Sequence, residues 1–177
     1  IEKLNSEDWE RTLKINVISH FYFTKLAIPM LKKNKGGSII NISSGAGIMG
    51  FPLRSPYAAS KWAIIGVTKT LAMELGKFKI RVNAICPVIV STKGLIAALE
   101  ERESPAKGNV NEFINNFRNN EAALPELPKG YEIANSCLFL ASDLASVFIS
   151  CSDPLDLASD IAAFVSTSTT LPVFEDK

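Results

Sequence analysis

The sequence contains few of the residues that build metal centres or disulfide frameworks. It has one histidine, His20, and three widely spaced cysteines without a C-x-x-C pair, Cys86, Cys137 and Cys151. A zinc site needs several convergent His, Cys or carboxylate ligands, so the pattern argues against a metal centre. An odd number of scattered cysteines is typical of reduced thiols, and we therefore expect a cytoplasmic protein.

The chain also lacks an excess of charge of either sign and a long apolar run. Its 177 residues include 19 basic and 18 acidic side chains, which give a formal net charge of +1. This balance argues against nucleic acid or an anionic membrane as the main partner, because both select for a basic excess. Each apolar stretch is broken within a few positions, so no segment predicts a membrane span, and the first residues do not resemble a secretory signal.

Glycine is missing from the last part of the sequence, since all ten glycines lie at or before Gly130. The final stretch is instead rich in serine and threonine. We therefore expect one domain over residues 1–150, for which a hydrophobic content of 47% provides an ample core. Residues 151–177 are expected to form a divergent tail.

Hydrophobic periodicity predicts alternating helices and strands in the first half of the chain. Helical spacing of apolar residues after a cap at Asn5-Ser6 indicates a helix to about residue 31, and a second long helix covers residues 57–76. Two runs of branched residues predict short strands at 38–43 and 80–86. This order is typical of parallel strands joined by crossover helices, which is an α/β fold.

Beyond the second predicted strand the pattern becomes more polar. Residues 91–103 and 110–121 predict two amphipathic helices, and residues 132–142 predict a more apolar one. The branched run at residues 147–149 predicts a last strand.

The clearest chemical signal is the segment Tyr57-Ala58-Ala59-Ser60-Lys61. Residues four positions apart on a helix lie on one face, about one turn from each other. A phenol exchanges protons poorly at neutral pH, but a nearby ammonium stabilises the phenolate and lowers the pKa of a phenol toward the useful range. The spacing indicates a site for general acid–base chemistry, although Tyr-x-x-x-Lys alone also occurs on many helices without such a role.

Two further polar residues are candidates for the same site. Ser44 lies 13 residues before Tyr57, at the end of the first predicted strand, where parallel sheets bind their ligands. Its hydroxyl could donate to a substrate carbonyl oxygen; Ser43 is the alternative, and the spacing favours Ser44. Asn16 interrupts a hydrophobic helix with an amide, which a backbone carbonyl of that helix could equally satisfy.

Taken together, these motifs resemble the short-chain dehydrogenase/reductase family. The family's order and spacing are found in Asn16, Ile40-Asn41-Ile42-Ser43-Ser44, Tyr57-x-x-x-Lys61 and Arg81-Val82-Asn83-Ala84-Ile85-Cys86-Pro87. Residues 132–143 also resemble its late helix. The resemblance covers roughly residues 5–150 and implies a doubly wound parallel sheet, Rossmann-like, of which the chain would hold only the C-terminal part.

The resemblance implies an NAD- or NADP-dependent oxidoreductase that interconverts an alcohol and a ketone or aldehyde by hydride transfer. In such a mechanism Tyr57 would be the general acid and base, and Lys61 would bind the nicotinamide ribose. Ser44 would orient the substrate oxygen, and Asn16 would hold a water molecule in a proton relay.

The resemblance also identifies positions near the nicotinamide, with departures from the family pattern. Pro87, Val90 and Thr92 match positions that contact this ring in the family. Glycine usually follows the proline, whereas Val88 stands here, and a branched side chain takes more room and excludes a positive φ. The family's Thr-Gly-x-x-x-Gly-x-Gly turn has no counterpart in residues 1–177, so we expect a fragment that binds cofactor weakly and is inactive by itself.

The segment from residue 91 to residue 125 matches the family's substrate-binding lid. Leu95 and Phe113 are expected on its apolar inner face, which would suit a small-molecule alcohol or carbonyl compound. In the family the helix that carries the tyrosine joins a dimer bundle, so a homodimer or homotetramer is expected.

Two other functions compete with the enzyme. A catalytically inactive family member that acts as a binding or scaffold protein is favoured by Val88 and by the divergent tail, and disfavoured by the intact Asn16, Ser44, Tyr57 and Lys61. A hydrolase that uses Ser44 as nucleophile lacks a partnered histidine.

Overall fold

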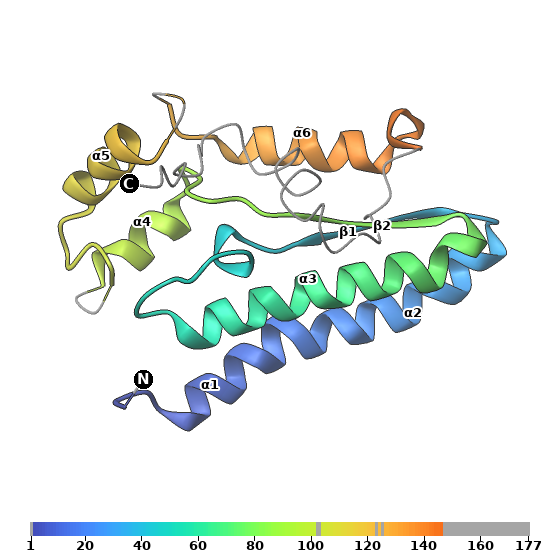
Figure 1. Ribbon diagram of the computed structural model, residues 1–177, viewed down its shortest axis with the longest axis horizontal. Helices are drawn as coiled ribbons and strands as arrows, with labels where there is room; N and C mark the ends of the chain where they lie inside the picture. Colours follow the sequence, from blue (N-terminus) through green and yellow to red (C-terminus); the bar gives the residue numbers. More distant parts are fainter. Residues whose placement is uncertain (1, 102–103, 123, 125, 147–177) are drawn as a thin grey trace, which may run out of the picture.

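The computed structural model describes residues 2–101, 104–122, 124 and 126–146 (Figure 1). The strand predicted at residues 147–149 and the tail predicted at residues 151–177 lie outside this part of the chain.

One long helix begins the fold and consists of three consecutive parts. They are α1, Ser6–Leu13, a π-helical turn, Lys14–Ile18, and α2, Ser19–Lys33. The helix was predicted from the sequence, whereas the π turn was not. A π turn inserts one extra residue, and such turns occur frequently at functional sites. Here the Ser19 N–H bonds to the Lys14 carbonyl, which closes the wider ring.

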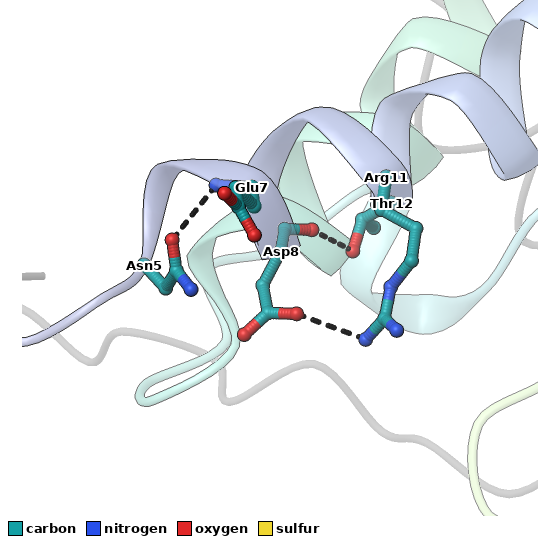
Figure 2. Close-up of polar contacts among 5 residues, drawn as sticks. All are labelled: Asn5, Glu7, Asp8, Arg11 and Thr12. Atoms are coloured by element: carbon teal, nitrogen blue, oxygen red, sulfur yellow. Dashed lines mark hydrogen bonds and ion pairs between the residues drawn. The ribbon is translucent and has the colours of Figure 1, made fainter.

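The start of α1 shows why the helix begins where it does (Figure 2). The Asn5 side-chain oxygen accepts a hydrogen bond of 2.9 Å from the Glu7 N–H and so satisfies one of the free amides of the first turn. Arg11 forms an ion pair of 2.9 Å with Asp8, and the Thr12 hydroxyl donates to the Asp8 carbonyl at 2.8 Å. The predicted cap at Asn5 is therefore confirmed.

The described part of the sheet consists of two parallel strands, β1, Gly37–Ile42, and β2, Ile80–Ile85. Gly37 lies opposite Ile80, and Ile42 lies opposite Ile85, so the two carboxyl ends are level. The strands are joined through α3, Ser55–Leu75, which confirms the predicted strand–helix–strand unit.

The remaining elements follow β2. They are α4, Lys93–Glu100, α5, Val110–Asn120, and α6, Gly130–Ala141. The helix predicted at 91–103 is shorter in the structure, because Thr92 caps its start and Glu101 already has extended backbone angles. Short 3₁₀ turns lie at Gly45–Gly47, Gly76–Phe78 and Asp143–Ala145.

Helices cover both faces of the two strands, which gives three layers (Figure 1). On one face, Val82 and Ile80 pack with the α3 residues Ala72 and Leu75, and Ile28 and Leu31 of α2 extend this core. On the other face, Ile85 packs against Leu140 of α6 and Ala145. Alternation along each strand sends neighbouring residues to opposite cores, as expected for a sheet covered on both sides.

Arg81 fixes the end of α6 to the sheet. Its guanidinium donates to the carbonyl of Leu140 at 2.7 Å and to that of Ser142 at 3.1 Å, and the Ser38 hydroxyl also donates to the Leu140 carbonyl, at 2.9 Å. The last carbonyls of a helix have no partner within it, and a cation there also complements the helix dipole.

Among the described residues, no helix is both long and apolar enough to cross a lipid bilayer. The same residues contain no group of three or more His, Cys, Asp or Glu side chains that could hold a metal ion.

We predict that Arg81→Met lowers the free energy of unfolding by about 1–3 kcal/mol, because two charge-assisted hydrogen bonds to helix-end carbonyls are lost. Arg11→Met is the matched control, since it removes an ion pair whose arginine side chain is 72% exposed, and such pairs contribute only about 0–1 kcal/mol. Urea unfolding followed by tryptophan fluorescence measures both. Equal losses in the two variants would show that Arg81 does not hold α6.

Candidate active site

The candidate residues come together at the carboxyl ends of β1 and β2. Ser43 and Ser44 directly follow β1, and Tyr57 lies in the first turn of α3, which begins at the same edge of the sheet (Figure 1). Pro87 and the segment leading into α4 follow β2 there. Because the strands are parallel and their ends are level, one edge receives residues that are far apart in the sequence.

Tyr57 and Lys61 lie one helical turn apart on α3. The Lys61 Nζ is 5.6 Å from the centre of the Tyr57 ring, and it donates a hydrogen bond of 3.0 Å to the carbonyl of Ile42, the last residue of β1. Burial lowers the pKa of the Lys61 ammonium from its usual value, and the neighbouring Cys86 thiol partly opposes this effect. The ammonium is thus half-buried, close to the tyrosine ring, and tied to the end of the strand.

The two serines after β1 make different hydrogen bonds. Ser43 is buried, and its hydroxyl donates to the Lys61 carbonyl at 2.9 Å. Ser44 is only half-buried, and its oxygen accepts a hydrogen bond of 3.2 Å from the Ala46 N–H, which caps the 3₁₀ turn Gly45–Gly47. The proton of Ser43 is therefore used within the fold, whereas the Ser44 hydroxyl donates no hydrogen bond to the described residues.

Asn16 lies in the middle of the π turn, and its side-chain amide donates to the Ser60 hydroxyl at 3.0 Å. The amide is therefore satisfied by a side chain of α3 rather than by a carbonyl of its own helix. Ser60, in turn, donates to the Tyr57 carbonyl at 2.7 Å.

The segment after β2 packs closely against the Ser44 loop. The Gly45 N–H donates to the Pro87 carbonyl at 2.8 Å, and a Cβ atom on Gly45 would lie 3.2 Å from a methyl group of Val88. Val88 has no positive φ, and it lies beside Gly45, which has no side chain. Its branched side chain therefore causes less backbone strain and crowding than the sequence predicts. Val90 is half-buried, and the Thr92 oxygen accepts from the Leu95 N–H at 3.2 Å as the cap of α4.

Two predicted lid residues, Leu95 on α4 and Phe113 on α5, are both half-buried. Both helices lie at the end of the molecule where the strands have their carboxyl ends (Figure 1). Arg54, the residue before α3, donates to the Ala98 carbonyl of α4 at 3.2 Å and lies 3.9 Å from the Glu101 carboxylate. This link between α4 and the start of the tyrosine helix was not predicted, because nothing in the sequence pattern pairs Arg54 with residue 98.

Cys86 is a further buried group beside the candidate residues. Burial raises the pKa of its thiol, while hydrogen bonds from the Ser43 side chain and the Ser44 backbone, and the Lys61 charge, act in the opposite direction. Cys86 directly follows β2, and the end of β2 is level with the end of β1. From this position in the sequence, Cys86 could have been predicted to lie beside the candidate residues.

His20, the single histidine, lies on the helix one turn after Asn16. Its side chain lines a cavity of about 440 Å³ between α2 and β1, together with Phe23, Ala27 and Asn41 among others. Burial lowers the pKa of His20, the Lys61 charge adds to this effect, and the Asn16 carbonyl partly offsets it. A largely neutral imidazole near neutral pH follows from this environment.

The structure places a tyrosine, a lysine and a serine at the carboxyl edge of an α/β sheet, and comparison with known proteins identifies the family. Residues 1–103 match the family model for short chain dehydrogenases. An uncharacterized oxidoreductase of Thermotoga maritima is 37% identical over 145 residues, which cover 82% of this chain and 55% of that protein. The chain belongs to the short-chain dehydrogenase family.

Solved structures show the same likeness. A 4-hydroxyisoleucine dehydrogenase complexed with NADH superposes with a TM-score of 0.65 at 28% identity, over 82% of this chain and 56% of that one. The L-sorbose reductase of Gluconobacter frateurii, complexed with NADPH and L-sorbose, gives a TM-score of 0.73 at 25% identity, over 83% and 56%. The chain spans about half the length of the relatives that it matches. Its fold is the corresponding part of a doubly wound, Rossmann-like α/β sheet.

Gly47 permits the close contact between the Ser44 loop and α3. A Cβ atom there would lie 2.8 Å from the Lys61 carbonyl oxygen and 2.9 Å from its carbon, and would also overlap the Ser43 hydroxyl. Both backbone atoms belong to a regular helix, so they cannot move aside easily.

We predict that Gly47→Ala lowers the free energy of unfolding by about 1–3 kcal/mol through overpacking. Gly50→Ala in the same loop is the control, because a Cβ atom there has no neighbour within 4 Å, and it should leave stability unchanged or raise it slightly. Urea titration of both variants measures the difference. If Gly50→Ala is the more damaging variant, the proposed close approach is wrong.

Proposed function

We propose that this chain forms the proton-transfer half of an NAD- or NADP-dependent oxidoreductase that interconverts an alcohol and a ketone or aldehyde. The observation that carries the proposal is the half-buried Lys61 ammonium, 5.6 Å from the Tyr57 ring and bonded to the Ile42 carbonyl at the sheet edge. Membership of an oxidoreductase family supports the reaction class.

In this mechanism Tyr57 donates a proton to the substrate oxygen in carbonyl reduction and removes one in alcohol oxidation. A phenolate formed during the reaction is stabilised by the Lys61 charge one turn away. Burial disfavours the charged form of Lys61. A phenolate beside it would offset this effect and stabilise the ammonium.

The hydrogen bonds favour Ser44 over Ser43 as the residue that orients the substrate. The Ser43 proton is used by the Lys61 carbonyl, whereas Ser44 keeps a proton to donate to a substrate oxygen and has its own oxygen fixed by the Ala46 N–H. A hydroxyl held in this way is oriented before substrate arrives, which is what positioning catalysis requires.

The residues around Lys61 fit a nicotinamide cofactor. The ammonium has three N–H groups, of which one bonds to Ile42, so that others remain for the hydroxyls of a ribose. Pro87, Val90 and Thr92 would lie against the nicotinamide, and Asn16 would hold a water molecule of a proton relay. When bound, the nicotinamide supplies or accepts the hydride. Of the two solved relatives described above, one binds NADH and the other NADPH, so both cofactors are candidates.

We further propose that α4 and α5, within residues 91–125, form the substrate lid, with Leu95 and Phe113 on its inner face. The Arg54 contact with Ala98 supports this, because it ties α4 to the first turn of α3, where Tyr57 lies. A small-molecule alcohol or carbonyl compound with an apolar frame would match half-buried leucine and phenylalanine side chains.

A homodimer or homotetramer is proposed as the assembled state. The supporting observation is a set of large apolar side chains that stay exposed on the outer helices α2 and α3: Phe21, Tyr22, Leu26, Met30, Trp62 and Met73. Apolar side chains gathered on neighbouring helices are typical of a surface that is covered in an assembly.

The proposal includes weak cofactor binding by the 177-residue chain alone, because the sequence contains no glycine-rich turn of the Rossmann type. We attribute the expected inactivity to this weak binding, so millimolar NAD(H) or NADP(H) should restore measurable turnover in assays of this chain. Micromolar binding in a calorimetric titration would contradict this part of the proposal.

We predict that Tyr57→Phe reduces turnover of an alcohol and ketone panel by at least about 100-fold, since a general acid–base group contributes about 10²–10⁴. Tyr131→Phe is the matched control, because Tyr131 is 60% exposed on α6, and it should keep wild-type turnover. The measurement is cofactor absorbance at 340 nm, with unfolding curves to show that both variants fold. Undiminished turnover in Tyr57→Phe would instead favour the alternative, an inactive family member that acts as a binding or scaffold protein.

A further inference from the structure

Ser60 connects the two halves of the candidate site. Its side chain is fully buried, at 0% exposure, between the π turn and the first turns of α3. The hydroxyl accepts the Asn16 amide at 3.0 Å and donates to the Tyr57 carbonyl at 2.7 Å. A serine hydroxyl has one proton, and here that proton goes to the Tyr57 carbonyl. The hydroxyl oxygen is therefore the acceptor in its bond with the Asn16 amide.

We infer that Ser60 is a positioning residue, which sets the Tyr57 peptide and the Asn16 amide in one fixed arrangement; this inference rests on the proposed function. The Asn16 side chain reaches Ser60 across 44 residues of sequence, and the π turn carries it there. Through Ser60, the long first helix and the tyrosine helix are held at the point where the proton is transferred.

The same helix contains a second link of identical chemistry away from the site. The Thr68 hydroxyl accepts the Asn41 amide at 2.9 Å and donates to the Ile64 carbonyl at 2.7 Å, and Thr68 is also buried, at 2% exposure. Both links therefore place a hydroxyl between a side-chain amide and a helix carbonyl. Only the Ser60 link includes the backbone of Tyr57.

This pair separates positioning from general stabilisation. Removal of either hydroxyl leaves a side-chain amide N–H without its acceptor, partly buried for Asn16 and buried for Asn41, so both variants should lose stability, Thr68→Ala at least as much as Ser60→Ala. Only loss of the Ser60 hydroxyl removes a side-chain hydrogen bond from the Tyr57 carbonyl and the acceptor of the Asn16 amide. Small misplacements of a reacting group lower rates strongly, about 100-fold for about 1 Å, so Ser60→Ala should lose more catalysis than Thr68→Ala although it loses no more stability.

The experiment compares Ser60→Ala with Thr68→Ala in the full chain, by two measurements. The first is the NMR spectrum of protein labelled with ¹³C in the tyrosine rings, of which the chain has three. The Tyr57 ring signal, assigned by its absence in Tyr57→Phe, should move in Ser60→Ala and stay in place in Thr68→Ala. This measurement does not need turnover.

The second measurement is turnover against pH at millimolar cofactor. Ser60→Ala should lower turnover about 10-fold to 100-fold and displace the pH profile, while Thr68→Ala changes turnover less than about 3-fold. A double-mutant cycle with Asn16→Ala should show strong non-additivity in turnover, because both changes break the same link.

The outcomes distinguish the inference from the proposed function. If Tyr57→Phe retains turnover, or no turnover is found in the wild type, the proposed function fails, and the ring signals still decide whether Ser60 positions Tyr57. If Tyr57→Phe is inactive but Ser60→Ala and Thr68→Ala behave alike in both measurements, the inference about Ser60 is overturned.

Discussion

The hydrogen bond from the Lys61 ammonium to the Ile42 carbonyl is the contact on which the candidate site depends. A half-buried ammonium needs an acceptor, and the end of β1 supplies one at 3.0 Å. This bond fixes the second turn of α3 against the end of the strand. Tyr57 is on this helix and Ser44 comes shortly after this strand, so both lie at one edge of the sheet.

Serine hydroxyls donate to two carbonyls of α3, one from the loop after β1 and one from within the helix. Ser43 donates to the Lys61 carbonyl and Ser60 to that of Tyr57, so the carbonyls of both key residues have side-chain partners. Gly47 lets the loop after β1 approach closely enough for the first of these bonds. The side chains proposed to carry the chemistry are therefore positioned by neighbours that take no part in it, which is typical of sites built on rigid elements.

Much of the fold could be predicted from the sequence, because apolar periodicity indicates both long helices and the two strands. The parallel pairing followed from element order alone. The π turn at Lys14–Ile18 could not be predicted, since no residue pattern in the sequence marks a single inserted residue there. The partners of Asn16 and Arg54 were also missed, because each lies 44 residues away and depends on how helices pack. Spacing favoured Ser44 over Ser43, and the hydrogen bonds add a physical reason for the same choice.

A crystal structure of the protein with NAD⁺ or NADP⁺ bound tests the central claim most directly. The account predicts that the Lys61 Nζ keeps its bond to the Ile42 carbonyl while donating to the ribose hydroxyls, with the Tyr57 hydroxyl facing the same side. A cofactor whose ribose lies away from Lys61, or a Lys61 side chain that leaves Ile42 and points to solvent, would contradict it.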